Sequence, residues 1–344
     1  MRSVTGRKEL NQTTFSKARG LTLVELMISL VLGLLVIAGV GSVFVANKQS
    51  YRTNEALGQV QDGSRVAYEF MARDIRMAGY GDVCSNFNFP INVIADPPPA
   101  GDFGLVTGGI KAIEGAVEPG TTTTSTGLIA GPIGGITVKG DTSIVQLDYF
   151  PSLADASPHL VGNLPPNNAN IQINENTPGF VAGDTLFITD CTQADVFRAS
   201  TVSTGTKTIT IAHASNVNTD NKLSKSYGGD AFVFNINDYR SVTYFIGQRV
   251  GGNNPQYSLY RKVNAGAPVE LVRGVTDMQI GYHKIGSSVY ETAVNGWGAT
   301  DWEAVDSVRI SYQVESDMQN VTTDGNPLTR TFSSTVAIRN RLPG

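Results

Sequence analysis

The pattern of hydrophobic and polar residues changes twice along this chain of 344 residues. Residues 21–46 form an apolar run that contains a single charged residue, Glu25. Residues 47–79 then show an amphipathic pattern, with apolar residues at helical spacing along one face: Val60, Ala67, Met71, Ile75 and Ala78. No proline precedes Pro90 and Gly79 is a suitable stop, so the pattern predicts one long helix from about Thr22 to Ala78.

The two halves of this predicted helix differ in their polar residues. In the second half, we expect the charged residues to occupy other faces than the apolar one: Arg65, Glu69, Arg73, Asp74 and Arg76. The first half contains Gly39-Val40-Gly41-Ser42. Each glycine costs a helix about 1 kcal/mol, which predicts local melting at this place. Close packing of small residues against another helix explains the same stretch equally well.

Residues 80–344 change to the pattern of a β-rich globular head. Several strand-like runs alternate in polarity, which is typical of a sheet with one buried face, and short loops between them favour antiparallel pairing. Proline at 97–99 and the Gly/Thr-rich residues 121–127 indicate a Gly/Thr/Pro-rich insertion around 96–140. The predicted fold class is α+β, with the long helix packed on a mainly antiparallel sheet. The predicted strands are Ser143–Phe150, Thr185–Thr189, Lys207–Ala212, Ala231–Asn235, Ser241–Ile246, Gln256–Val263, Val275–Tyr282, Val305–Val314 and Thr331–Arg339.

The composition fits an exported, loop-rich body. The chain is 41% hydrophobic and only 16% charged, and it contains 37 glycines. Its net charge is −4, and the first twenty residues hold five basic residues and one acid, so their removal leaves −8. An acidic body repels phosphate backbones, so we expect no direct nucleic-acid binding.

Two cysteines, Cys84 and Cys191, are the whole cysteine content of the chain. Neither lies in a metal-binding spacing. If the body is exported, a disulfide between them is the natural interpretation, and two buried free thiols are the alternative.

The apolar run is long enough to cross a membrane. Residues 21–45 contain no proline, lysine or arginine, and as a helix they span about 37 Å, against a hydrocarbon core of about 30 Å. The basic residues all precede the run, which places the N-terminus in the cytoplasm and the body outside. An ordinary signal peptide has a shorter apolar region, followed by a small-x-small site. Here the small residue, Gly20, comes before the run instead.

The stretch Lys17-Ala18-Arg19-Gly20, followed by Leu21-Thr22-Leu23-Val24-Glu25-Leu26, resembles the type IV prepilin (class III) signal. That resemblance implies that residues 1–20 are a leader, which a membrane peptidase removes by cutting between Gly20 and Leu21. It also implies N-methylation of Leu21 and places Glu25 at the fifth mature position. The family commonly has Phe at the first mature position, where this chain has Leu21.

Electrostatics gives Glu25 a role in such a protein. A charged side chain in lipid costs a few kcal/mol and is rarely kept without a partner. Cleavage would create a cationic amine at Leu21, and opposite charges about 4 Å apart attract by roughly 4 kcal/mol at an effective dielectric near 20. We therefore predict that Glu25 pairs with the Leu21 amine of a neighbouring subunit and sets the axial register. Snorkelling of Glu25 to lipid headgroups is the alternative.

Three further stretches are similar to PilW-type minor pilins and to the GspJ pseudopilins of type II secretion. They are Arg65–Tyr80, Leu271–Tyr282 and Val305–Tyr312, and the final stretch Thr335–Arg341 resembles the PilW terminus. The similarity covers roughly residues 17–80 and 269–341, whereas residues 82–268 carry no such signal.

The sequence contains no arrangement of residues that is typical of catalysis. His159, His213 and His283 are scattered, and we expect each to be a surface or loop residue. Residues 216–221 are rich in Asn and Asp and contain oxygens that suit a hard cation, but a plain polar turn is the better interpretation. The sequence therefore predicts no metal, no cofactor and no enzymatic activity.

Together these features predict a minor pilin that primes pilus assembly and stays near the tip, which by resemblance supports twitching motility, adhesion and DNA uptake. Residues 21–46 would anchor it in the inner membrane, and residues 47–79 and the head would lie in the periplasm before the subunit joins the surface fibre. Its expected partners are other minor pilins, the major pilin, the prepilin peptidase and a tip adhesin. The alternatives are a GspJ-like pseudopilin of type II secretion and a membrane-anchored periplasmic binding or adhesion protein that never polymerises.

Overall fold

The structure is a computed structural model that describes residues 20–80, 84, 89–99, 109–113, 132–150, 158–205, 208–249, 256–292 and 297–341. Most of the predicted leader, at 1–19, and much of the predicted insertion, at 100–108 and 114–131, lie outside the described residues. The chain forms two compact units, Met1–Asn54 and Glu55–Gly344. The second unit is called the body below.

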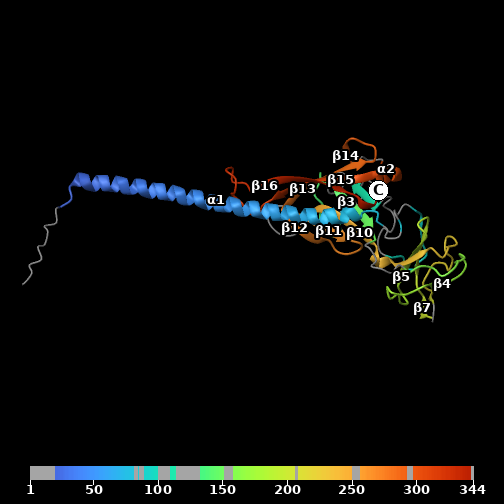
Figure 1. The fold of residues 1–344 in the computed structure, drawn as a ribbon. Helices are drawn as coiled ribbons and strands as arrows, with labels where there is room; N and C mark the ends of the chain where they lie inside the picture. Colours follow the sequence, from blue (N-terminus) through green and yellow to red (C-terminus); the bar gives the residue numbers. More distant parts are fainter. Residues whose placement is uncertain are drawn as a thin grey trace, which may run out of the picture. The chain divides into compact units, whose positions relative to one another are not determined.

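A single helix, α1 (Leu23–Met77), contributes to both units (Figure 1). It is unbroken at Gly39-Val40-Gly41-Ser42, where the Ser42 hydroxyl donates to the Gly39 carbonyl at 2.8 Å. The structure thus gives no support to local melting, and packing of these small residues against a partner helix stays a prediction. The predicted stop is confirmed, because Gly79 has φ +70°, a conformation that favours glycine just beyond a helix end.

The part of α1 in the body buries the predicted apolar face. Five residues at helical spacing are at most 1% exposed, namely Val60, Ala67, Met71, Ile75 and, just past the helix end, Ala78. They share one hydrophobic core with strands of two sheets. The expectation for Asp74 was wrong: its side chain is buried on this same face, because it finds polar partners on the sheet.

Two sheets build the core around this half of α1. The first has the order β12 (Val269–Arg273), β11 (Tyr257–Val263), β10 (Arg240–Gln248), β3 (Ile144–Tyr149) and β2 (Ile110–Ile113). The second has the order β14 (Tyr290–Thr292), β13 (Val275–Lys284), β15 (Val305–Glu315) and β16 (Thr329–Ala337). All pairs in both sheets are antiparallel.

The middle of the chain adds two smaller sheets with hydrophobic clusters of their own. One has the order β1 (Ile91–Val93), β6 (Ala194–Arg198), β5 (Thr185–Thr189) and β9 (Phe232–Asn235). The other has the order β4 (Asn170–Ile173), β8 (Ile209–Ala212) and β7 (Thr201–Thr204). Within the described ranges, β1 and β6 form the only parallel pair of named strands. Short helices complete the body: η2 (Ile236–Asp238), α2 (Ala299–Glu303) and η3 (Arg339–Arg341).

The predicted fold class, α+β with a mainly antiparallel sheet, is confirmed. Each of the nine predicted strands overlaps an observed strand, and the predictions missed short strands such as β4 and β6. The insertion around 96–140 stays a prediction, and its described residues include a strand of the first sheet. This strand, β2, pairs with β3, and its Ile110 is buried in the core of that sheet.

Two polar predictions for the middle region have different outcomes. His213 lies in a loop just after β8, as one part of the expectation had it, but its side chain is fully buried, with its ring against Phe197 and its Nε2 3.2 Å from the Asn168 carbonyl oxygen. Burial lowers the pKa of His213, so the neutral ring fits this apolar place. The polar turn at 216–221 fits the structure, since the Asn218 amide bonds to the backbone of Arg198 and Ala214.

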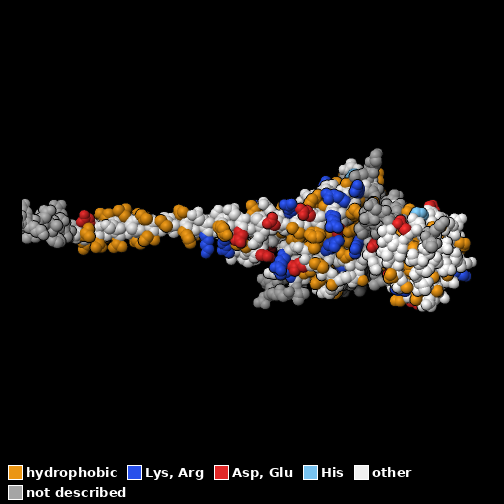
Figure 2. Space-filling model, turned by 60° about the horizontal axis from the view of Figure 1, so that its bottom comes forward, with side chains coloured by type: hydrophobic (Ala, Val, Ile, Leu, Met, Phe, Trp, Pro, Cys, Tyr) orange, Lys and Arg blue, Asp and Glu red, His pale blue; other side chains and the backbone are white. Residues whose placement is uncertain are grey.

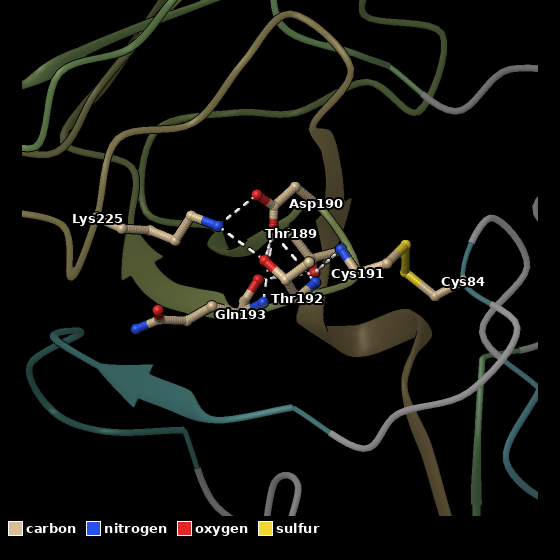
Figure 3. Close-up of a disulfide and its surroundings, with 7 residues drawn as sticks. All are labelled: Cys84, Thr189, Asp190, Cys191, Thr192, Gln193 and Lys225. Atoms are coloured by element: carbon tan, nitrogen blue, oxygen red, sulfur yellow. Dashed lines mark hydrogen bonds and ion pairs between the residues drawn. A yellow bond between two sulfur atoms is a disulfide. The ribbon is translucent and has the colours of Figure 1, made fainter.

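Cys84 and Cys191 form a disulfide in the structure (Figure 3). They are 107 residues apart in sequence, so the bridge removes conformational freedom from a long loop of the unfolded chain. For a loop of this length the chain-entropy argument gives about 4 to 5 kcal/mol. Disulfides persist in oxidising compartments, which fits export of the body.

Hydrogen bonds shape the turn after β5 that presents Cys191 (Figure 3). The Cys191 amide donates to the Thr189 hydroxyl at 3.0 Å, and the Thr192 amide donates to the Asp190 carboxylate at 3.1 Å. The Lys225 ammonium pairs with that carboxylate and also reaches the Thr192 hydroxyl at 2.8 Å. Burial alone would raise the pKa of Asp190, but the bonds from Lys225 and Thr192 outweigh it and lower the pKa.

Candidate processing and assembly site at the start of the long helix

The predicted cleavage position lies on exposed, non-helical backbone. Gly20, Leu21 and Thr22 precede α1, and all three are exposed. Among the described residues other than its chain neighbours, no heavy atom lies within 4 Å of the position that a Gly20 Cβ would take. The described part of the chain therefore does not cover the predicted cleavage position.

Thr22 and Glu25 cap the start of α1. The Glu25 amide donates to the Thr22 hydroxyl at 3.2 Å, and the Thr22 amide donates to the Glu25 carboxylate at 3.2 Å. This reciprocal pair is a capping box, which satisfies two backbone donors that a helix start leaves without partners. Glu25 therefore has a local role in addition to the assembly role predicted for it. The spacing Thr-x-x-Glu, visible in the sequence, is the signal for this box.

The helix beyond the cap exposes apolar side chains along its length, and Figure 2 shows them on the face in view. Every large apolar side chain from Leu21 to Val45 is between 52% and 75% exposed. By length and composition, α1 is apolar enough to cross a membrane. Its hydroxyl groups bond within the helix, as Ser29 does to the Glu25 carbonyl at 2.7 Å, which removes the cost of placing them in lipid. Such a surface needs a bilayer or other apolar helices around it.

The predicted ion pair of Glu25 requires a terminal amine at Leu21. In the uncut chain, that nitrogen belongs to the peptide bond with Gly20. Glu25 lies four residues after Leu21, in the exposed first turn of the helix. The ion pair with a neighbouring subunit, the cleavage after Gly20 and the N-methylation of Leu21 stay predictions.

A comparison with known protein families points to the same segment. Residues 15–41 match the family described as the prokaryotic N-terminal methylation motif. The match includes Gly20, Leu21 and Glu25, and it supports a type IV pilin-like or pseudopilin-like role with membrane anchoring and processing by prepilin peptidase. Neither the comparison with curated proteins nor that with solved structures found a match.

A second polar site fixes the end of α1 to the first sheet. The Asp74 carboxylate is 2% exposed and accepts hydrogen bonds from the hydroxyls of Tyr149 at 2.8 Å and Tyr244 at 2.6 Å. Arg261 Nε donates to it at 2.9 Å. The three partners come from β3, β10 and β11, so one side chain of α1 ties it to three adjacent strands. Sequence reasoning missed this site because a charged residue was assigned to the solvent side.

The pKa values of the partners reflect this arrangement. Burial, together with the Asp74 charge, raises the pKa of both Tyr149 and Tyr244, so both stay protonated donors. Burial alone would lower the pKa of Arg261, but Asp74 and Tyr244 outweigh it and raise the pKa. Arg261 thus stays a cation and Asp74 has a permanent counter-charge.

Among the described residues, no group of three or more His, Cys, Asp or Glu side chains could hold a metal ion. His283 is half-buried on β13, with its Nδ1 2.7 Å from the Asp306 carboxylate, and His159 is exposed. The absence of a cofactor and of enzymatic activity stays a prediction.

Proposed function

We propose that this chain is a minor pilin of a type IV pilus. The observation that carries the proposal is the methylation motif at residues 15–41, followed by a helix whose apolar surface needs either lipid or neighbouring helices. A subunit of this kind is cut after Gly20, N-methylated at Leu21 and held in the inner membrane until its helix moves into the fibre. The work is geometric, and the chain is a substrate of the processing enzymes rather than a catalyst.

The size of the body favours a minor subunit over the repeating major one. The body extends from Glu55 to Gly344, and its middle region adds two sheets with separate hydrophobic clusters. A fibre packs its helices closely, so a large head on every subunit would crowd the surface, whereas a head at the tip has free space. We infer that the chain joins other minor pilins in the complex that primes assembly and remains near the tip, where it contacts the major pilin and any tip adhesin.

Deletion of the gene in its bacterial host is expected to reduce surface fibres strongly, and the protein itself is expected in fibres sheared from wild-type cells. Immunoblots of the sheared fraction, with an inner-membrane protein as the contamination control, measure both. Twitching on a surface should be lost together with the fibres, and type II secretion of an exoenzyme should continue.

The other outcomes would contradict the proposal. Normal fibres with lost secretion would assign the chain to a GspJ-like pseudopilin. Normal fibres and normal secretion, with the protein confined to the membrane fraction, would assign it to a membrane-anchored protein that does not polymerise.

A further inference from the structure

The body contains a cavity that is rich in arginine. Its volume is about 720 Å³, and it lies beside the end of α1, between that helix, the first sheet and η3. Five guanidinium groups line it, with the apolar side chain of Met77 among them: Arg73, Arg76, Arg240, Arg261 and Arg339. In Figure 2, Lys and Arg side chains are concentrated in one area of the body, and fewer lie elsewhere on the face in view.

Part of this charge is balanced by acidic groups of the body, since the Asp238 carboxylate interacts electrostatically with the Arg240 guanidinium. Arg261 pairs with the buried Asp74. The side chains of Arg73, Arg240 and Arg339 are exposed and form no hydrogen bond or ion pair with another described residue. Arg76 is 3.5 Å from the Tyr68 hydroxyl, at the limit of a hydrogen bond. Like charges around a hollow reinforce one another, so the cavity carries a concentrated positive potential.

The rest of the protein has the opposite sign, since the chain without its first twenty residues has a net charge of −8. An extended polyanion would therefore be attracted by the arginines of the cavity, while the negative net charge of the protein would repel the parts of it that extend beyond the cavity. Duplex DNA carries one charge per about 1.7 Å of its axis, so a bound duplex would extend past the cavity along a protein whose net charge is negative. A short anionic ligand matches the charge distribution better.

We propose that this cavity binds a short acidic segment of a partner protein. Guanidinium groups present their N–H donors in a planar fork that fits a carboxylate with two parallel hydrogen bonds. The volume lies within the range of about 300 to 1,000 Å³ that is common for ligand pockets. Met77 offers an apolar wall to the methylene groups of Glu side chains. We take the partner to be a neighbouring pilin, and this identity rests on the proposed function. The binding of an acidic segment to the cavity does not depend on that function.

The test uses the full chain in non-ionic detergent and a fluorescein-labelled hexaglutamate peptide, with binding followed by fluorescence anisotropy at about 25 mM salt, where screening is weak. The double variant Arg73→Gln/Arg240→Gln removes two exposed arginines and leaves the pair of Arg261 with Asp74 intact. The matched control is Arg65→Gln/Arg330→Gln, which removes exposed arginines from α1 and β16 outside the cavity. We expect the first variant to bind at least about tenfold more weakly than wild type. The control should stay within about twofold of wild type.

Unfolding midpoints in urea show that both variants fold, so a loss of binding reports on the cavity. The inference is overturned if the wild-type chain does not bind hexaglutamate, or if both double variants lose binding equally. It is also overturned if a thymidine hexanucleotide binds more tightly than hexaglutamate and depends on the same two arginines, which would identify a nucleic-acid site. None of these outcomes bears on cleavage at Gly20, so failure here is distinguishable from failure of the proposed function.

Discussion

Replacing Asp74 with alanine is expected to destabilise the body by about 3 to 5 kcal/mol, the range for removing one partner of a buried charge pair. The variant leaves the Arg261 guanidinium without its counter-charge and the hydroxyls of Tyr149 and Tyr244 without their acceptor. The Arg261 side chain is 25% exposed and keeps part of its hydration, so the loss should fall toward the lower end. Urea unfolding in non-ionic detergent measures it through tryptophan fluorescence, since Trp302 packs in the core that α1 completes.

The matched control is Asp62→Ala, which removes an exposed carboxylate from the same helix and should change the stability by less than about 0.5 kcal/mol. The double variant Asp74→Ala/Arg261→Met should lose less than the sum of the single variants, because no charge is left unpaired. A loss below about 1 kcal/mol for Asp74→Ala would show that the site does not anchor the helix.

Replacing Glu25 with glutamine is expected to prevent incorporation into fibres almost as completely as replacing it with alanine. Glutamine can still accept the Thr22 amide in the capping box, but it has no charge, whereas alanine lacks both properties. If the charge pairs with a neighbouring amine, the attraction of roughly 4 kcal/mol is lost in both variants, which is about a thousandfold in the pairing equilibrium. Immunoblots of sheared fibres and of membranes measure the distribution of each variant.

Ser29→Ala is the matched control, since this hydroxyl bonds only to the helix carbonyl of Glu25 and its loss should not affect assembly. The Glu25 variants should still be cut at Gly20, which separates assembly from processing. If Glu25→Gln assembles like the wild-type chain while Glu25→Ala fails, the role of Glu25 is helix capping and the predicted ion pair is wrong.

Long periodic segments of the fold could be predicted from the sequence, and short ones could not. In β15, Val308, Ile310 and Tyr312 alternate with polar residues and are all buried, as the pattern predicted. β6 has only five residues and carries Asp195 at its second position. The Asp195 carboxylate is fully buried because distant groups, such as the Tyr227 hydroxyl at 2.7 Å, donate to it. A single sequence does not show such partners, so the acid at position 195 argued against a buried strand at 194–198.

The same limit applies to the polar sites. Thr22 and Glu25 are three residues apart, and their capping box is visible as a local motif. Asp74 follows Ala67 by seven residues and Met71 by three, so its spacing indicated the buried face, but its charge argued against burial. Only the folded sheet reveals the tyrosines and the arginine that make burial favourable. Local spacing thus reveals the cap at the start of α1, whereas the attachment of its last turns to the sheet depends on long-range contacts.

The most direct test of the account is mass spectrometry of the N-terminal peptide from the chain isolated in sheared fibres. We predict a peptide that begins at N-methylated Leu21, with Met1 through Gly20 absent. A fibre-incorporated chain that still carries Met1 through Gly20 would contradict it, because no amine would then be available at Leu21 to pair with Glu25.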